Sequence, residues 1–183
     1  SILKFLIDNG NLKEEKKEVY RTSDIINRKS QDYSLTLEQD TVINSVIMGK
    51  FTPYLLHGVT GSGKTLVYIK LIEKVLGEGK EAILLVPEIS LTPQVVNIFK
   101  GHFGEIVAIL HSGLSNGEKY DEWRKIERGE VSIVIGARSA IFAPFTNVGI
   151  IIIDEEHSST YKQENVPRYD TISVALKRGQ THN

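Results

Sequence analysis

From about residue 35 onward, hydrophobic and polar positions alternate along the chain in a regular way. Between the apolar runs, hydrophobic residues recur at the three- and four-residue spacing of a helix. Short apolar strands that alternate with amphipathic helices predict an α/β fold, a parallel sheet with helices on both faces. The runs typical of buried strands are residues 82–86, 106–110, 131–135 and 150–153, with a shorter one at 54–56.

Capping signals predict where the helices begin. Ser or Thr followed three residues later by Glu or Gln forms a capping box, and Pro directly after a capping residue fits the first helical position. One helix, with an apolar stripe over residues 42–47, is expected to end at Gly49, and another near Gly129. The predicted starts are Thr36 with Gln39, Thr92 with Pro93, and Ser115 with Glu118.

The first thirty residues differ in character from the rest. An apolar stretch at residues 2–7 is followed by a run of charged residues at 13–18. This segment is either the last helix and a charged hairpin of a preceding domain, or a linker, and such a charge run is usually a solvated face. A boundary near Ser30 divides the chain into residues 1–30 and 31–183.

Bulk composition excludes several classes of protein. A hydrophobic fraction of 40% in 183 residues is enough for a full core, and the net charge of −1 excludes a strongly basic protein. Any contact with nucleic acid must therefore come from a local surface. The absence of cysteine excludes disulfides and thiolate metal sites from this stretch. No apolar run is long enough for a membrane span and no secretory signal is present, so a cytoplasmic protein without membrane contact is expected.

Residues 58–65 read GVTGSGKT, which matches the phosphate-binding loop pattern G-x-x-x-x-G-K-S/T. In such a loop, backbone N–H groups surround the phosphates, the Lys ammonium reaches the β/γ oxygens, and the last hydroxyl binds magnesium. A helix N-terminus behind the loop also favours anions. The alternative is a Gly-rich turn before an ordinary helix. The predicted nucleotide-binding residues are Gly58, Thr60, Gly61, Ser62, Gly63, Lys64 and Thr65.

A second acidic motif completes the predicted hydrolytic site. Residues 154–157 read DEEH and directly follow an apolar run. Carboxylates at the end of a buried strand face the crevice where ligands of α/β sheets bind, so Asp154 is predicted to hold magnesium and Glu155 to polarise the attacking water. The separation from Lys64, 154 − 64 = 90 residues, accommodates three crossovers of about 30 residues each. The alternative is an acidic helix start.

These two motifs resemble motifs I and II of superfamily 2 helicases and translocases. Together with the sequence between and around them, over residues 35–178, they resemble one family, the primosomal replication-restart helicases (PriA family). Residues 1–30 resemble, more weakly, the end of that family's winged-helix domain. The stretches that carry the resemblance are residues 56–65, 85–94, 111–114, 135–145 and 154–157.

The resemblance implies ATP as the nucleotide and assigns further residues. Gln39 corresponds to the Gln that reads adenine, although it also belongs to a capping box. Thr92, Arg138 and Ser139 lie in the segments that hold single-stranded DNA by its phosphates. For Thr92 the alternative role is a helix cap, and for Arg138 a structural salt bridge. Ala137 stands where the family usually has Thr, which removes one possible hydroxyl contact.

A loop after the second motif is aromatic-rich in this family and couples DNA binding to ATP hydrolysis. Here residues 161–169 contain Tyr161, Lys162 and Arg168, which are predicted to contact DNA, because tyrosines can stack on bases and cations pair with phosphates. An ordinary surface loop is the alternative. Val166 and Pro167 replace a position that is often aromatic or Gly in the family.

The resemblance implies the first RecA-like lobe of an ATP-dependent 3′→5′ DNA helicase acting at stalled forks. Implied partners are single-stranded and forked DNA, other primosome proteins and single-stranded DNA-binding protein. The Ser-Ala-Thr motif, the second lobe with its arginine finger and the zinc-binding insertion fall outside these residues, so zinc is expected only there. Little turnover is expected from this lobe alone, because the transition-state cation would come from the second lobe.

Three other functions fit parts of the pattern. Another superfamily 2 translocase, of RecG or restriction-subunit kind, is disfavoured by residues 83–94 and 133–145. A P-loop phosphotransferase would need a lid and an acceptor pocket and would not be stimulated by DNA. A non-catalytic scaffold with a nucleotide switch would not need both Asp154 and Glu155.

Overall fold

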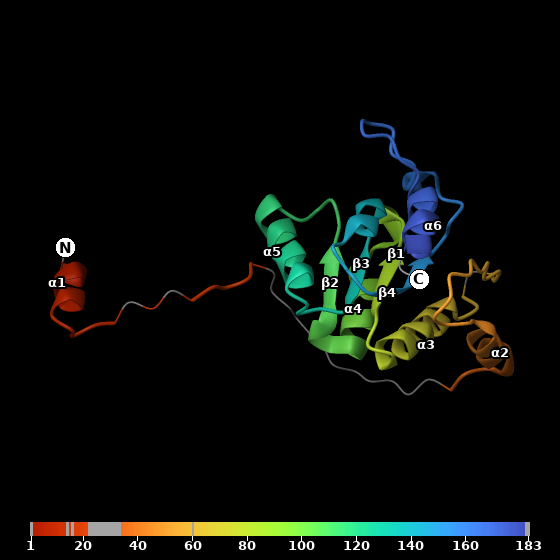
Figure 1. Ribbon diagram of the computed structural model, residues 1–183, viewed down its shortest axis with the longest axis horizontal. Coiled ribbons are helices and arrows are strands. Elements are labelled where there is room, and N and C mark those ends of the chain that lie inside the picture. The colour runs from red at the N-terminus through yellow and green to blue at the C-terminus, as the bar shows by residue number, and fades with distance from the viewer. Residues whose placement is uncertain (1, 14, 16, 22–33, 60, 182–183) are drawn as a thin grey trace.

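A computed structural model describes residues 2–13, 15, 17–21, 34–59 and 61–181. Its four strands form one sheet in the order β2-β3-β1-β4, and every neighbouring pair is parallel. The predicted α/β fold with a parallel sheet is confirmed (Figure 1). The strands are β1 (Glu81–Leu85), β2 (Val107–Leu110), β3 (Ile133–Gly136) and β4 (Val148–Ile153).

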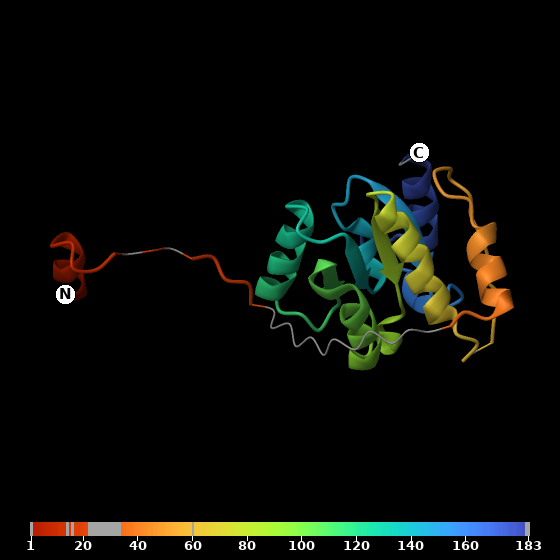
Figure 2. The same ribbon diagram turned by 90° about the horizontal axis from the view of Figure 1, so that it is seen from below.

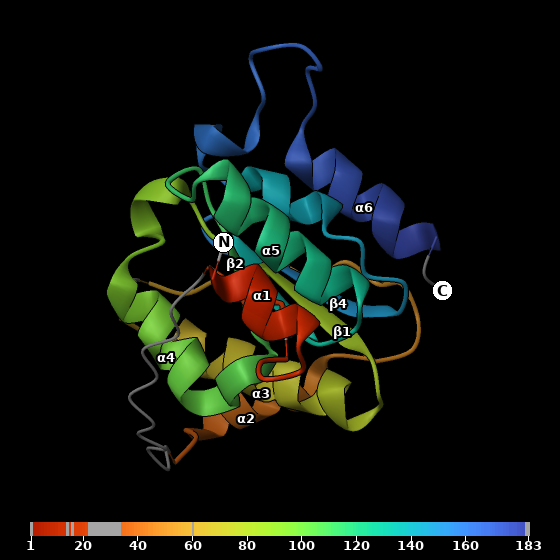
Figure 3. The same ribbon diagram turned by 90° about the vertical axis from the view of Figure 1, so that its left-hand side faces the viewer.

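Helices cover both faces of the sheet, as the pattern predicts. α3 and α4 pack on one face through Ile72 and Phe99, and α5 and α6 pack on the other through Ile126 and Ala175 (Figure 3). α2 lies outside α3 (Figure 2). The helices are α1 (Ile2–Asp8), α2 (Leu37–Ser45), α3 (Lys64–Gly77), α4 (Pro93–Phe103), α5 (Asn116–Glu127) and α6 (Thr171–Thr181), with short 3-10 turns η1 (Glu88–Ser90), η2 (Gly104–Ile106), η3 (Arg138–Phe142) and η4 (Ser159–Tyr161).

The alternation of side chains along β1 explains why the sheet is buried on both sides. Ala82 and Leu84 pack with α3 and α4, whereas Ile83 and Leu85 pack with α5 and α6, and all four are at most 1% exposed. Each large aliphatic side chain buried in this way contributes about 1.5–3 kcal/mol. This double layer fixes the strand ends that carry the polar residues.

The predicted helix starts are all observed. Both capping boxes form, at Thr36 and at Ser115, and the Thr92 hydroxyl accepts a hydrogen bond from the Val95 N–H at 3.4 Å. α5 ends at Glu127, close to the expected stop, but α2 ends at Ser45, before the predicted stop.

The expected strand at residues 54–56 is wrong. These residues have no regular secondary structure, and the side chains of Tyr54 and Leu55 are 48% and 78% exposed. A run of three apolar residues is too short to distinguish a strand from a loop that places one side chain in the core. Only Leu56 does so, packing against the cluster of Ile43, Val67 and Leu71.

Between residues 2 and 21, the described positions contain α1 and no strand, so the charged hairpin is not observed there. α1 lies apart from the sheet in Figures 1 and 2. The boundary predicted near Ser30 falls outside the described residues. Within the described part, no helix combines the length and the apolar character that a bilayer crossing would require.

Candidate nucleotide and DNA site

The carboxyl ends of the four strands meet at one edge of the sheet, where ligands of parallel sheets bind. Asp154 directly follows β4, and Arg138 begins η3 after β3. Lys64 begins α3, which packs against β1 and β4. The motifs that are distant in sequence are therefore gathered at one edge.

Positive φ angles shape the phosphate loop. Gly61 and Gly63 have φ values of 81° and 80°, a region that glycine adopts without steric cost. At Gly63 a side chain would also collide, because a Cβ atom would lie 2.4 Å from Nε2 of Gln39. The N–H of Ser62 donates to the Val59 carbonyl at 3.2 Å and closes the turn. Thr60 lies outside the described residues.

Gln39 joins the helix cap to the phosphate loop. Its Oε1 accepts the Thr36 N–H at 3.0 Å, and its Nε2 donates to the Ser62 carbonyl at 3.3 Å. The capping function is thus confirmed, and the same amide lies beside the nucleotide loop. Its contact with adenine stays a prediction.

The ammonium of Lys64 folds back over its own loop. It donates to the carbonyls of Gly58 at 2.7 Å and Val59 at 3.1 Å. A negatively charged phosphate oxygen attracts the ammonium more strongly than an uncharged carbonyl does. We therefore expect the ammonium to leave the carbonyls when phosphate binds.

Two tyrosines, Tyr68 and Tyr161, hold Asp154 in place. The sequence pattern did not predict that they act together. The hydroxyl of Tyr68 donates to Oδ1 of Asp154 at 2.9 Å, and the hydroxyl of Tyr161 donates to the Asp154 backbone carbonyl at 2.7 Å. Burial and the nearby negative charge of Asp154 raise the pKa of both hydroxyls, which therefore remain proton donors. Tyr68 could have been noticed, because it lies one helical turn after Lys64.

Glu155 has a backbone conformation that is rare for its residue type. It is the one non-glycine residue with positive φ in the described chain, at 47°, and its N–H donates to Oδ1 of Asp154 at 3.1 Å. Such a conformation costs about 1–3 kcal/mol and is frequent at functional sites. Residues 154–157 form a turn, so the alternative of an acidic helix start is wrong.

The donor set at this edge fits a magnesium ion better than a softer metal. Thr65 is exposed in the first turn of α3, three residues before the tyrosine that binds Asp154. Because residues three apart on a helix are neighbours, we expect the Thr65 hydroxyl and the Asp154 carboxylate to face the same space. Hard oxygen ligands of this kind suit magnesium, which usually keeps several waters. Nowhere in the described residues, this edge included, do three or more His, Cys, Asp or Glu side chains form a cluster that could hold a metal.

Arg138 is engaged with backbone and not with a carboxylate. Its Nη1 donates to the carbonyls of Thr160 at 3.1 Å and Lys162 at 2.7 Å, so the alternative of a structural salt bridge is wrong. Arg138 is partly buried, whereas Ser139 and Thr92 are exposed. Contacts of these three residues with DNA phosphates stay predictions.

Tyr161 does not lie on a surface loop. Its side chain is 1% exposed and belongs to the core beneath α6, so the prediction that this ring contacts DNA is wrong, because a buried ring cannot stack on a base. The following residues do project from the molecule (Figure 3). Lys162 and Arg168 are exposed there, and an isolated antiparallel β-bridge pairs the backbones of Lys162 and Asp170.

Comparison with known proteins gives a consistent result. A family model described as DEAD/DEAH box helicase matches residues 36–182. The chain is 58% identical to the replication restart protein PriA of Bacillus subtilis, over 99% of this chain and 23% of that protein. It is 49% identical to the protein of the same name from Synechocystis, over 82% of this chain and 18% of the relative.

A further replication restart protein PriA, from Haemophilus influenzae, is 47% identical over 73% of this chain and 18% of its own length. The chain spans about a fifth of the length of these relatives. Because the helicase model covers well over half of the chain, and its phosphate loop and acidic turn meet at one edge of a parallel sheet, the chain belongs to the DEAD/DEAH box helicase family.

Proposed function

We propose that this chain is the ATP-binding lobe of a cytoplasmic, ATP-dependent DNA helicase that moves 3′→5′ and acts in replication restart and primosome assembly. The observation that carries the proposal is the 2.9 Å hydrogen bond from Tyr68 to Asp154, which holds the acidic turn next to the first turn of the phosphate-loop helix. The similarity to replication restart proteins supports the biological role.

ATP hydrolysis would divide among four side chains. Lys64 binds the β- and γ-phosphates, Thr65 and Asp154 hold magnesium, and Glu155 orients the attacking water. When bound, magnesium neutralises charge on the transferred phosphoryl group. Gln39, already in contact with the loop, is placed to bind the base.

DNA would bind at the same edge of the sheet. Thr92, Ser139, Lys162 and Arg168 are exposed and polar, which suits a grip on phosphates without sequence preference. Arg138 connects this surface to the acidic turn, because the carbonyls it binds flank Tyr161. Single-stranded and forked DNA are the proposed substrates, with other primosome proteins and single-stranded DNA-binding protein as partners.

The test is the ATPase rate of the longer protein that contains this chain, with and without single-stranded DNA. We expect stimulation by DNA in the wild type, loss of nucleotide affinity in Lys64→Ala, and retained binding with lost turnover in Glu155→Gln. Equal rates with and without DNA would overturn the helicase proposal and favour a P-loop phosphotransferase.

A further inference from the structure

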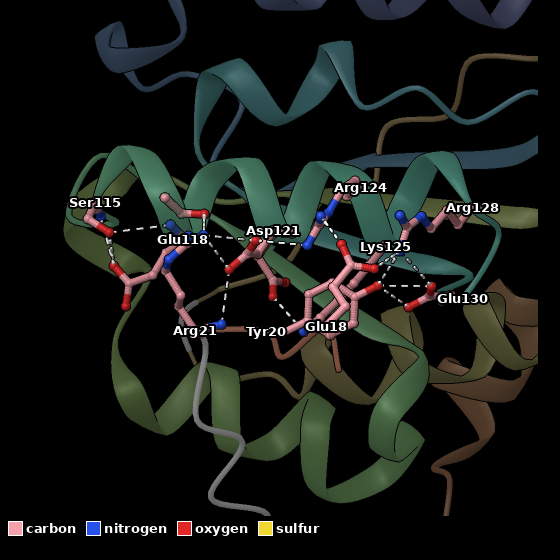
Figure 4. Close-up of polar contacts among 12 residues, drawn as sticks. Glu18, Tyr20, Arg21, Ser115, Glu118, Asp121, Arg124, Lys125, Arg128 and Glu130 are labelled. Carbon is pink, nitrogen blue, oxygen red and sulfur yellow. Dashed lines mark hydrogen bonds and ion pairs between the residues drawn. The ribbon is translucent and has the colours of Figure 1, made fainter. Parts of the chain in front are cut away.

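The segment before the sheet domain contacts it through charged and aromatic side chains. Residues 18–21 lie along one side of α5, at the β2 end of the sheet and far from β4 in the strand order (Figure 4). We call residues 18–21 the clasp. Its partners on or directly after α5 are Gly117, Asp121, Arg124, Lys125, Arg128 and Glu130.

Arg21 binds a carboxylate that is otherwise shut away from water. Asp121 is 0% exposed, and its Oδ2 accepts the Arg21 backbone N–H at 2.9 Å, while the Arg21 guanidinium lies 3.1 Å from both carboxylate oxygens. Arg124 approaches Oδ1 from the helix side at 3.1 Å. The pKa of Asp121 is lowered, first by the hydrogen bond from the Arg21 N–H and then by the positive charges of Arg21 and Arg124.

Tyr20 supplies an aromatic face and a hydroxyl. The cations of Arg124 and Lys125 lie 5.4 and 4.8 Å from the ring centre, within the range of a cation–π interaction. The hydroxyl donates to the Glu130 carboxylate at 2.8–2.9 Å. Tyr20 is therefore held against α5 by its ring as well as by its hydroxyl.

Glu18 completes the arrangement at the end of α5. Its carboxylate pairs with Arg124 and, at 2.9 Å, with Arg128. The hydrogen bond from Arg128 is the main cause of the lowered pKa of Glu18. Acid, aromatic and base at positions 18, 20 and 21 therefore each meet a complementary group. Glu18 is exposed, as expected for a charge run on a solvated face, but its carboxylate is also paired with two guanidinium groups.

Gly117 makes room for the clasp. A Cβ atom at this position would lie 3.1 Å from Cδ of Arg21 and 3.2 Å from its Nε. Glycine in a helix costs about 0.5–1 kcal/mol relative to alanine. At Gly117 it leaves the surface of α5 open to the arginine.

We propose that this side of α5 is a docking surface for the chain's own residues 18–21. The clasp holds the N-terminal segment at the β2 end of the sheet, so that its attachment to the lobe is independent of nucleotide at the β4 end. This inference does not rest on the proposed helicase function, because it concerns only contacts between the clasp and α5.

Amide hydrogen exchange of Arg21 gives a direct test, because its N–H is hydrogen-bonded only if the clasp is closed. In the wild-type chain at low salt we expect this amide to exchange about tenfold or more slowly than that of exposed Val19, since hydrogen bonds to charged groups are the stronger ones. Asp121→Asn should remove most of the protection, and Glu18→Gln about half of it. The matched control is Glu127→Gln, an exposed acid on the same helix, which should change nothing.

Equal exchange rates at Arg21 and Val19 in the wild type would overturn the proposal. So would protection that survives both Asp121→Asn and Glu18→Gln. Exchange of the β1 and β3 amides in the same experiment reports whether the sheet is intact. If Asp121→Asn unfolds it, Glu18→Gln decides the question, because that side chain is exposed. Nucleotide affinity should be equal in wild type and Glu18→Gln, and a severalfold change would contradict the claimed independence.

Discussion

At the β4 end of the sheet, polar groups are held in positions that a ligand would complete, whereas at the β2 end they are already paired with one another. The Lys64 ammonium donates hydrogen bonds to uncharged backbone carbonyls, and Glu155 has an unfavourable positive φ. By contrast, Asp121 and Glu18 meet guanidinium groups directly. The difference indicates that one end is built to change on binding and the other to stay closed.

The largest expected effect comes from breaking the scaffold that both ends share. A Cβ atom at Gly136 would lie 2.2 Å from the Leu110 carbonyl oxygen, between β2 and β3. We expect Gly136→Ala to lower the free energy of unfolding by about 3 kcal/mol, because backbone cannot yield as a side chain can. Gly77→Ala, with open space around it, should change stability by less than about 1 kcal/mol. Urea unfolding of both variants measures the difference, and equal midpoints would contradict it.

A substitution at Gly63 should damage the β4 end alone. In Gly63→Ala the new side chain adds strain of about 1–3 kcal/mol and displaces the Gln39 amide. We expect at least a tenfold loss in affinity for a fluorescent ATP analogue. Gly79→Ala, which also has positive φ but no atom within 4 Å, should lose stability without losing affinity. Similar affinities in the two variants would refute the proposed role of the loop geometry.

Removal of the Tyr68 hydroxyl should have a smaller effect on the same end. Tyr68→Phe deletes the hydrogen bond to Asp154 without changing the apolar packing, which we expect to cost about 1–2 kcal/mol and to slow ATP turnover about tenfold. Tyr120→Phe is the control, because that tyrosine is 60% exposed on α5. The turnover number of the longer protein is the measurement. An unchanged rate would mean that Asp154 is positioned without this tyrosine.

The smallest effect is the response of the clasp to acid. The pKa values of Glu18 and Asp121 are lowered below their ordinary values of 4.5 and 3.8 by Arg128 and by the Arg21 N–H, respectively. A lowered pKa in the folded state stabilises the closed clasp above the ordinary value, and this contribution is lost as pH falls through the lowered pKa. The cations that face these two acids are Arg21, Arg124 and Arg128, and the negative charge of Asp121 acts on Glu18 in the opposite direction.

We therefore expect protection of the Arg21 amide to be unchanged from pH 7 to about pH 5 and to decline below about pH 4. The decline should occur at higher pH than the acid unfolding of the sheet, followed by circular dichroism. Simultaneous loss of both signals would show that the clasp is an integral part of the sheet domain and not a separate contact.

Local signals in the sequence were sufficient for features that depend on neighbouring residues. The capping residues Thr36, Thr92 and Ser115 each bind the N–H group of a residue three positions later, so their pattern is visible within four residues. The alternation of apolar strands and helices likewise predicted the parallel sheet, because a sheet buried on both faces requires it.

Contiguous residues were thus sufficient to predict the four strands of the sheet, the capped helix starts, the phosphate loop and the acidic motif. Packing in three dimensions was needed to show that Tyr161 is buried, that residues 54–56 form no strand, and that Tyr68 contacts Asp154, 86 positions away. It also brought Arg21 to Asp121, 100 positions away. The physical reason is that burial and charge pairing depend on which segments the packed sheet places side by side, and no local pattern specifies that.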